Sequence, residues 1–117
     1  MRHESFACAA FVALRRKYKV AIIAGCDSEF PCIADFSADF VYVRAMGTVE
    51  KEKMVYSKAA IAAWAVRAQV WEAGVAPIDL PLLVKPVAKK RHDVFLFVIS
   101  GFKARNPAAA QAIIAVL

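Results

Sequence analysis

One stretch of the sequence is especially informative about the fold: Val94-Phe95-Leu96-Phe97-Val98-Ile99. It is short, continuously apolar and rich in β-branched and aromatic residues, which predicts a strand buried on both faces. Two further stretches, residues 20–24 and 40–44, have the same character and predict two more strands. The chain therefore contains at least three candidate strands for one buried sheet.

Helical patterns separate or flank these strands. Apolar residues recur at helical spacing over residues 6–17, 58–74 and 107–117, which predicts three helices. The predicted capping residues are Ser5, Ser57 and Asn106 at the helix starts and Gly74 at the end of the second helix. The connection over residues 75–92 contains three prolines and no periodicity, and we expect it to run over the surface.

Strands that are apolar on both faces and alternate with helices indicate a parallel sheet covered by helices, that is, an α/β protein. Trp64 and Trp71 are seven residues apart and share one face of the second predicted helix, so we expect both to pack in the core.

Composition limits the class of protein. A chain of 117 residues is one domain or less, which excludes a multidomain enzyme, and 61% hydrophobic residues exclude disorder. The longest apolar run, residues 59–66, is far shorter than the roughly 20 residues that span a bilayer. The first residues do not have the pattern of a secretory signal, so we expect a cytoplasmic protein without a membrane partner.

The three cysteines are Cys8, Cys26 and Cys32. Their odd number and the absence of a Cys-x-x-Cys spacing argue against a disulfide framework and against a zinc ribbon. We therefore expect reduced, structural cysteines; the alternative is a redox-sensing pair formed by Cys26 and Cys32.

Several segments occur in an order that resembles one family. They are Arg2-His3-Glu4-Ser5-Phe6, Asp27, Asp39-Phe40-Val41-Tyr42-Val43-Arg44 with Gly47, Tyr56-Ser57, Trp64-Ala65, and Val94-Phe95-Leu96-Phe97 before an alanine-rich final helix. This series resembles the domain of unknown function 72 family, also called YecE-like, over essentially the whole chain. The resemblance implies a TIM-type barrel, and a complete barrel needs about 250 residues.

The resemblance therefore implies a half barrel. Residues 1–117 correspond to the C-terminal half of the family domain, with about three parallel strands, flanking helices and no N-terminal half. A truncated or split gene, a wrongly assigned start codon and an assembly artefact all remain open as the origin of this length. The chain departs from the family pattern at Met46, where a histidine is usual, and after Phe97, where an aromatic-Asn-Asn turn is common.

In parallel α/β folds the ligand lies beyond the carboxyl ends of the strands, and this rule selects the candidate site residues. The predicted catalytic residues are His3, Asp27 and Arg44, and the predicted ligand-binding residues are Arg2, Tyr42 and Ser100. A histidine, a carboxylate and a guanidinium form a plausible set for acid/base chemistry and anion binding. The alternatives are an Arg44–Asp27 structural ion pair and a purely structural His3.

These residue types favour an anionic or polyhydroxylated small-molecule ligand. They do not establish whether the protein is an enzyme, and they name no cofactor. We expect no metal site, because the second histidine, His92, precedes the third strand at the opposite end of the sheet.

Two other classes of partner are considered. An open half barrel would expose strand edges and an apolar inner face, which predicts self-association or pairing with an N-terminal half barrel. Most of the net charge of +6 lies in one basic stretch, whose cations are Lys85, Lys89, Lys90, Arg91, Lys103 and Arg105. No nucleic-acid-binding motif accompanies this stretch, so nucleic acid is not the expected partner.

Overall fold

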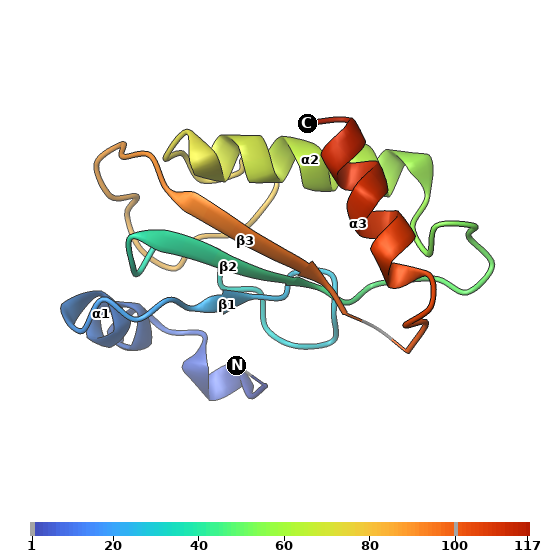
Figure 1. Ribbon diagram of the computed structural model, residues 1–117. Coiled ribbons are helices and arrows are strands. Elements are labelled where there is room, and N and C mark those ends of the chain that lie inside the picture. Colours follow the sequence, from blue (N-terminus) through green and yellow to red (C-terminus); the bar gives the residue numbers. More distant parts are fainter. Residues whose placement is uncertain (1, 100) are drawn as a thin grey trace.

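A computed structural model describes residues 2–99 and 101–117 and shows one three-stranded sheet (Figure 1). The strands are β1 (Ile23–Ala24), β2 (Phe40–Ala45) and β3 (Asp93–Val98), in the spatial order β1-β2-β3. Both pairs of neighbours are parallel. The predicted α/β fold with three parallel strands in one open sheet is confirmed, and the arrangement is consistent with part of a β/α barrel.

The first helical segment differs from the prediction. A 3₁₀ helix (Glu4–Phe6) precedes α1 (Ala9–Lys17), so the expected single helix over residues 6–17 is broken. Ser5 does not cap α1; its backbone N–H donates to His3 Nδ1 at 3.2 Å, and the N-cap of α1 is Cys8. The His3 ring nitrogen satisfies a backbone N–H of the first turn locally, which favours a separate 3₁₀ turn over a continuous helix.

β1 is shorter than predicted because a serine side chain takes its backbone partners. Ser37 Oγ donates to Val20 O and accepts from Ile22 N, both at 2.9 Å. These groups are therefore not available to a strand ladder, and pairing with β2 begins only at Ile23. The predicted strand over residues 20–24 is thus reduced to its last two residues.

α2 (Lys58–Glu72) confirms the predicted capping. Ser57 Oγ accepts from Ala60 N at 3.1 Å at the start of the helix. Gly74 follows the end of the helix with a φ of +81°, where a side chain would collide with the backbone of Lys90. Trp64 and Trp71 are 2% and 0% exposed, which confirms their predicted place in the core.

α3 (Asn106–Ala115) begins one residue earlier than predicted, because Arg105 and not Asn106 is the N-cap. Asn106 is the first helical residue and is buried, and Pro107 lies in the first turn, where a missing N–H leaves no hydrogen bond broken.

The two faces of the sheet have different surroundings. α2 and α3 pack together over one face, where Val41, Val43 and Ala45 are buried (Figure 1). Phe95 and Phe97 point to the other face and are 48% and 44% exposed. The prediction of strands buried on both faces is therefore wrong for β2 and β3 in this chain, because helices cover only one side.

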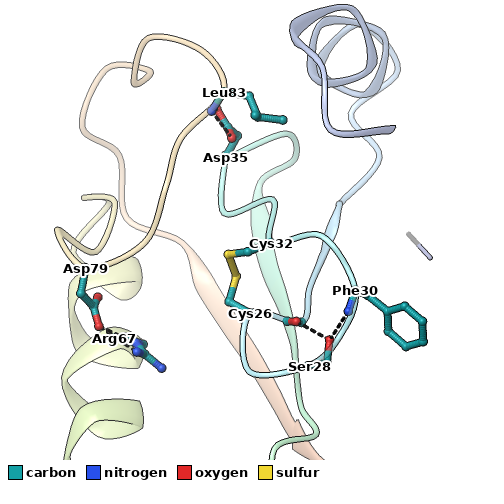
Figure 2. Close-up of a disulfide and its surroundings, with 9 residues drawn as sticks. Cys26, Ser28, Phe30, Cys32, Asp35, Arg67, Asp79 and Leu83 are labelled. Atoms are coloured by element: carbon teal, nitrogen blue, oxygen red, sulfur yellow. Dashed lines mark hydrogen bonds and ion pairs between the residues drawn. A yellow bond between two sulfur atoms is a disulfide. The ribbon is translucent and has the colours of Figure 1, made fainter. Parts of the chain in front are cut away.

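A second apolar cluster joins α1 to the long connection before β3. Val12, Ile22 and Ile33 form this cluster, and Leu83 packs against it. The buried carboxylate of Asp35 accepts hydrogen bonds from the backbone N–H groups of Leu83 and Val84, which fixes part of the connection to the body of the domain (Figure 2). Residues 75–92 are therefore anchored at their centre and are not a free surface loop.

The prediction of three reduced cysteines is wrong. Cys26 and Cys32 form a disulfide with a Cα–Cα distance of 4.4 Å, whereas Cys8 is free and exposed (Figure 2). The turn after β1 brings the two ends of residues 26–32 together, a geometry that sequence spacing alone does not reveal. Disulfides persist mainly in oxidising compartments. The disulfide therefore does not support the predicted cytoplasmic location, which stays a prediction.

Candidate functional site

The predicted site residues lie around the carboxyl ends of β1 and β2. Arg44 is the fifth residue of β2, and Asp27 follows the last residue of β1 by three positions. The parallel register places Tyr42 opposite Ile23 and Phe95, and Arg44 opposite Phe97. Side chains at these alternate positions share the face of the sheet that α2 and α3 leave uncovered.

Arg2 and Arg44 line one small cavity at this end of the sheet. The cavity has a volume of about 50 Å³, and its other lining residues are Ile23, Gly25, Phe30, Pro31 and Met46. The Arg2 guanidinium lies over the Phe30 ring, 5.3 Å from its centroid. None of the described residues that line this cavity is acidic, so its two guanidinium groups favour an anion.

Aromatic side chains continue from this cavity along the uncovered face. The Arg44 guanidinium lies 5.9 Å from the centroid of the Tyr42 ring, and Tyr42 stacks on Phe97 with centroids 5.1 Å apart. Further toward the start of the strands, Phe40 and Phe95 meet edge to face at 5.7 Å. The site thus combines a cationic end with an aromatic surface.

Asp27 holds the loop that follows β2. Its carboxylate accepts from the backbone N–H groups of Met46 at 2.9 Å and Gly47 at 2.8 Å, and Tyr56 donates its hydroxyl to the same carboxylate. A Cβ on Gly47 would lie 2.5 Å from the backbone oxygen of Asp27, so only glycine permits this approach. Burial, together with the hydrogen bond to Asp27, raises the pKa of Tyr56 above its ordinary value.

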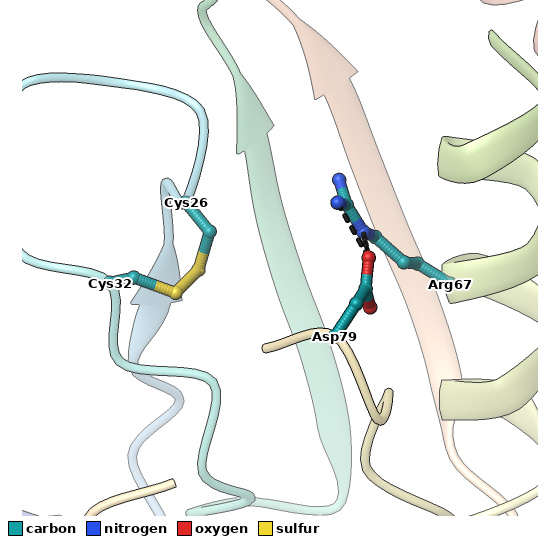
Figure 3. A network of polar contacts seen from close by, with 4 residues as sticks. All are labelled: Cys26, Cys32, Arg67 and Asp79. Carbon is teal, nitrogen blue, oxygen red and sulfur yellow. Dashed lines mark hydrogen bonds and ion pairs between the residues drawn. A yellow bond between two sulfur atoms is a disulfide. The ribbon is translucent and has the colours of Figure 1, made fainter. Parts of the chain in front are cut away.

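Asp27 and Arg44 line different cavities. The cavity beside Asp27 measures about 360 Å³ and is lined on the α2 side by Trp64 and Arg67. Arg67 also binds Asp79 at 2.8 Å, which lowers the pKa of Asp79 through their hydrogen bond (Figure 3). Among the described residues Asp27 pairs with backbone amides and Tyr56 and forms no ion pair with Arg44, so the structural ion pair considered as an alternative is not formed.

His3 is not brought into the cavity that holds Arg2 and Arg44. His3 is exposed, and its Nδ1 lies 2.8 Å from Ser5 Oγ, which makes it a cap of the 3₁₀ helix. Ser100, predicted to bind ligand, lies outside the described residues. The structure therefore unites Arg2, Arg44 and Tyr42, whereas Asp27 acts on the neighbouring loop.

The chain matches the family model described as "Protein of unknown function DUF72" over residues 1–117. The chain belongs to the DUF72 family. No curated protein and no solved structure matches it. The segment of this DUF72 chain from Asp39 to Gly47 supplies Tyr42, Arg44 and Met46 to the uncovered face and Gly47 to the Asp27 contact.

The basic stretch of the DUF72 chain is divided by the structure. Lys89, Lys90 and Arg91 precede β3, whereas Lys103 and Arg105 follow it, so β3 separates the two groups by about 20 Å. Lys90 pairs with Asp39 at 3.0 Å and Arg91 with Glu72 at 2.7 Å. The six cations do not form one continuous surface, which weakens the case for a nucleic-acid interface.

The sequence did not predict that the cavity of Arg2 and Arg44 is also lined by Phe30, Pro31 and Met46. It also did not predict that Tyr56 holds Asp27. A signal existed for the first two, because they lie between the cysteines that form the disulfide. For Tyr56 there was no local signal, since it approaches Asp27 across 29 positions of sequence.

Two features are absent from residues 2–99 and 101–117. No three His, Cys, Asp or Glu side chains in this part of the chain are grouped so that they could hold a metal ion. In the same part, every helix is too short or too polar to cross a membrane.

Proposed function

We propose that this DUF72 chain binds an anionic, polyhydroxylated small molecule at the carboxyl ends of its strands. In this proposal Arg2 and Arg44 bind the anionic group, Tyr42 contacts the rest of the ligand, and Asp27 positions the loop beside the site. The observation that carries the proposal is the cavity shared by two guanidinium groups from distant parts of the chain.

The shape of the site supports a ligand with one charged group and a larger neutral body. A volume of about 50 Å³ accommodates a small group, whereas ligand pockets commonly measure about 300–1,000 Å³. The remainder of a ligand would lie over Tyr42 and Phe97, whose stacked rings offer an apolar surface to the carbon face of a sugar. A phosphorylated sugar or a sugar acid has both parts.

We further propose that residues 1–117 form half of a closed barrel, with the uncovered face of the sheet as part of its interior. The half-exposed Phe95 and Phe97 support this proposal, because a closed barrel would bury both rings. β3 also has one edge without a partner strand among the described residues, where a further parallel strand could add.

The predicted proton-transfer role of His3 remains part of this proposal. Because His3 Nδ1 is engaged by Ser5, Nε2 is the ring nitrogen available to a ligand. A His3→Gln variant should retain ligand binding. If the wild type converts a bound ligand and this variant binds the ligand without converting it, the loss assigns His3 to proton transfer.

Thermal unfolding with a panel of small molecules tests the binding proposal. Gluconate, which carries a carboxylate and no phosphate, should raise the unfolding temperature of the wild type, whereas uncharged ribose should not. Arg44→Ala should abolish this protection, and Arg44→Lys should retain only part of it because lysine lacks the planar fork of donors. Arg91→Ala is the matched control, since Arg91 is exposed at the opposite end of β3. Equal protection of the wild type and Arg44→Ala would refute the proposed site.

The second candidate function is that of an interaction module. It is favoured by a groove of about 410 Å³ between α2, β3 and α3, where the apolar Leu96, Ile113 and Leu117 lie beside the polar Gln69, Glu72 and Asp93. We propose that a further β/α unit, from an N-terminal half barrel or a second copy, covers this groove and the edge of β3. Sedimentation of the chain alone should show self-association, and a single monomeric species across concentrations would contradict association with itself.

A further inference from the structure

A second cavity lies at the amino end of the sheet, opposite to the proposed binding site. It measures about 370 Å³ and is bounded by the end of α1, the segment that leads into β2 and the segment that leads into β3. Ser37, Ala38 and Asp39 line it just before Phe40, the first residue of β2. Arg44 is five positions further along β2 than Asp39, so the two sites are about 16 Å apart.

The charges around this cavity are strongly unbalanced. Its lining contains four cationic side chains, Arg16, Lys19, Lys89 and Lys90, and one carboxylate, Asp39. Lys90 pairs with Asp39 at 3.0 Å, which neutralises one cation and lowers the pKa of Asp39 through their hydrogen bond. Three cations therefore remain without an acidic counterpart in the cavity, which suits a multiply charged anion better than a single carboxylate.

The Arg16 side chain is held in a fixed position from which it can bind an anion. Its Nε donates to Phe36 O at 2.8 Å, and its Nη2 lies 3.5 Å from Lys85 O. Because a guanidinium has five N–H donors, these contacts fix the side chain and leave further donors available.

A buried histidine forms part of the wall of this cavity. His92 is 4% exposed and stacks on Phe36 with ring centroids 4.3 Å apart. Its Nδ1 is enclosed by protein, without a hydrogen-bond partner among the described residues, and is not exposed to the cavity. The ring therefore lies beside a bound group without binding it.

The backbone at Lys19 is also unusual. Lys19 follows α1 with a φ of +52°, a conformation that normally selects glycine after a helix. Its side chain lines the cavity, so the chain keeps a cation at a position where glycine would fit the backbone better.

We propose that the amino-end cavity, lined by Arg16, Lys19 and Lys89, binds a phosphate dianion, free or as the phosphomonoester of a small molecule. The guanidinium and ammonium groups neutralise the dianion. The His92 ring, stacked on Phe36, forms part of the wall beside it.

The nitrogen resonances of the two histidines test this proposal directly in the full chain. Inorganic phosphate is titrated at constant ionic strength, with chloride as the replaced anion, and His3→Gln assigns the two rings. Because the His92 ring lines the cavity, its nitrogen resonances should shift saturably with phosphate and not with chloride. A His92 resonance that does not respond to phosphate overturns the proposal.

Variants separate this site from the proposed site at the other end. Lys89→Ala and Lys19→Gly should each weaken the phosphate response of His92 at least about fivefold, while Lys103→Ala, an equal charge change beyond the end of β3, should not. Lys19→Gly suits the backbone, so its loss of binding would not reflect misfolding. Arg44→Ala should leave the response intact. If Lys103→Ala weakens the response as much as Lys89→Ala does, the binding is nonspecific attraction to a basic surface and the proposal fails.

Ribose 5-phosphate and vesicles with phosphorylated headgroups then distinguish the sources of the group. A His92 shift with ribose 5-phosphate matching that with phosphate supports a small-molecule ligand. A shift only with vesicles would refute the small-molecule assignment.

Discussion

The two faces of the sheet use the same strands for different purposes. On the covered face Val41, Val43 and Ala45 are small, aliphatic and buried against α2 and α3. On the uncovered face the alternate positions hold Tyr42 and Arg44, which are larger, polar or aromatic, and only half-buried. The covered face therefore provides stability, whereas the uncovered face presents chemistry that packing within this chain does not require.

The ends of the strands on the uncovered side are held by a different kind of interaction. In place of apolar packing, the Cys26–Cys32 disulfide closes the loop that carries Phe30 (Figure 2). Asp27 fixes the loop that begins at Met46. Covalent and polar contacts can keep a site ordered while it stays open to solvent. Substitutions in the two regions should consequently have different effects.

The largest effect is expected on the covered side. Trp71→Ala removes a side chain that is 0% exposed and leaves a large cavity beneath the sheet. Unfolding in urea should show a loss of about 3–5 kcal/mol, which is a large part of the stability of a domain of this size. A loss below about 1 kcal/mol would show that the helix layer is not the stabilising side.

The disulfide is expected to have the next largest effect. A double change, Cys26→Ser with Cys32→Ser, should reduce the free energy of unfolding by about 2 kcal/mol, because the short loop closed by the bridge gains entropy when unfolded. Hydrogen exchange should rise in residues 26–32 and remain unchanged in α2. Cys8→Ser is the control, and uniform loosening of the whole domain would contradict a local role.

Tyr56→Phe removes the hydroxyl that binds Asp27. We expect a loss of about 1.5 kcal/mol at neutral pH, since the two backbone amides still hold the carboxylate. The pKa of Tyr56 is raised in the folded state, so its contribution is complete below the unfolded value near 10 and declines as the pH rises above it. Urea unfolding from pH 8 to 11 should therefore show a steeper decline for the wild type than for Tyr56→Phe, whereas parallel curves would exclude a raised pKa.

The smallest effect on stability is expected on the uncovered face. Phe95→Ser removes a ring that is 48% exposed and should cost less than about 1 kcal/mol. The same change should reduce self-association in sedimentation experiments, because it removes apolar surface from the open face. A large loss of stability would mean that the ring is already covered in solution.

Local signals in the sequence predicted much of this architecture. The apolar run at residues 94–99, the cap at Ser57 and the glycine at position 74 each specify an element through nearby residues, and the structure has all three. The uncovered face of β2 and β3 was not predicted, because a strand with one covered face and a strand with two can have the same apolar sequence.

The site was predictable only in part. Strand ends place Arg44 and Asp27 at one end of the sheet, as expected for parallel strands. The partners of each side chain depend on loops that meet in space, which is why Asp27 binds Tyr56 and not Arg44. The buried His92 was recognised only as a residue at the opposite end, because its burial and its stacking on Phe36 arise from tertiary packing.

Hydroxyl-radical footprinting followed by mass spectrometry tests the contrast between the two faces most directly. In dilute protein, Phe95 and Phe97 should be oxidised readily, while Trp64 and Trp71 should be protected despite the high intrinsic reactivity of indole rings. Rapid oxidation of the two tryptophans together with protection of the two phenylalanines would contradict the account.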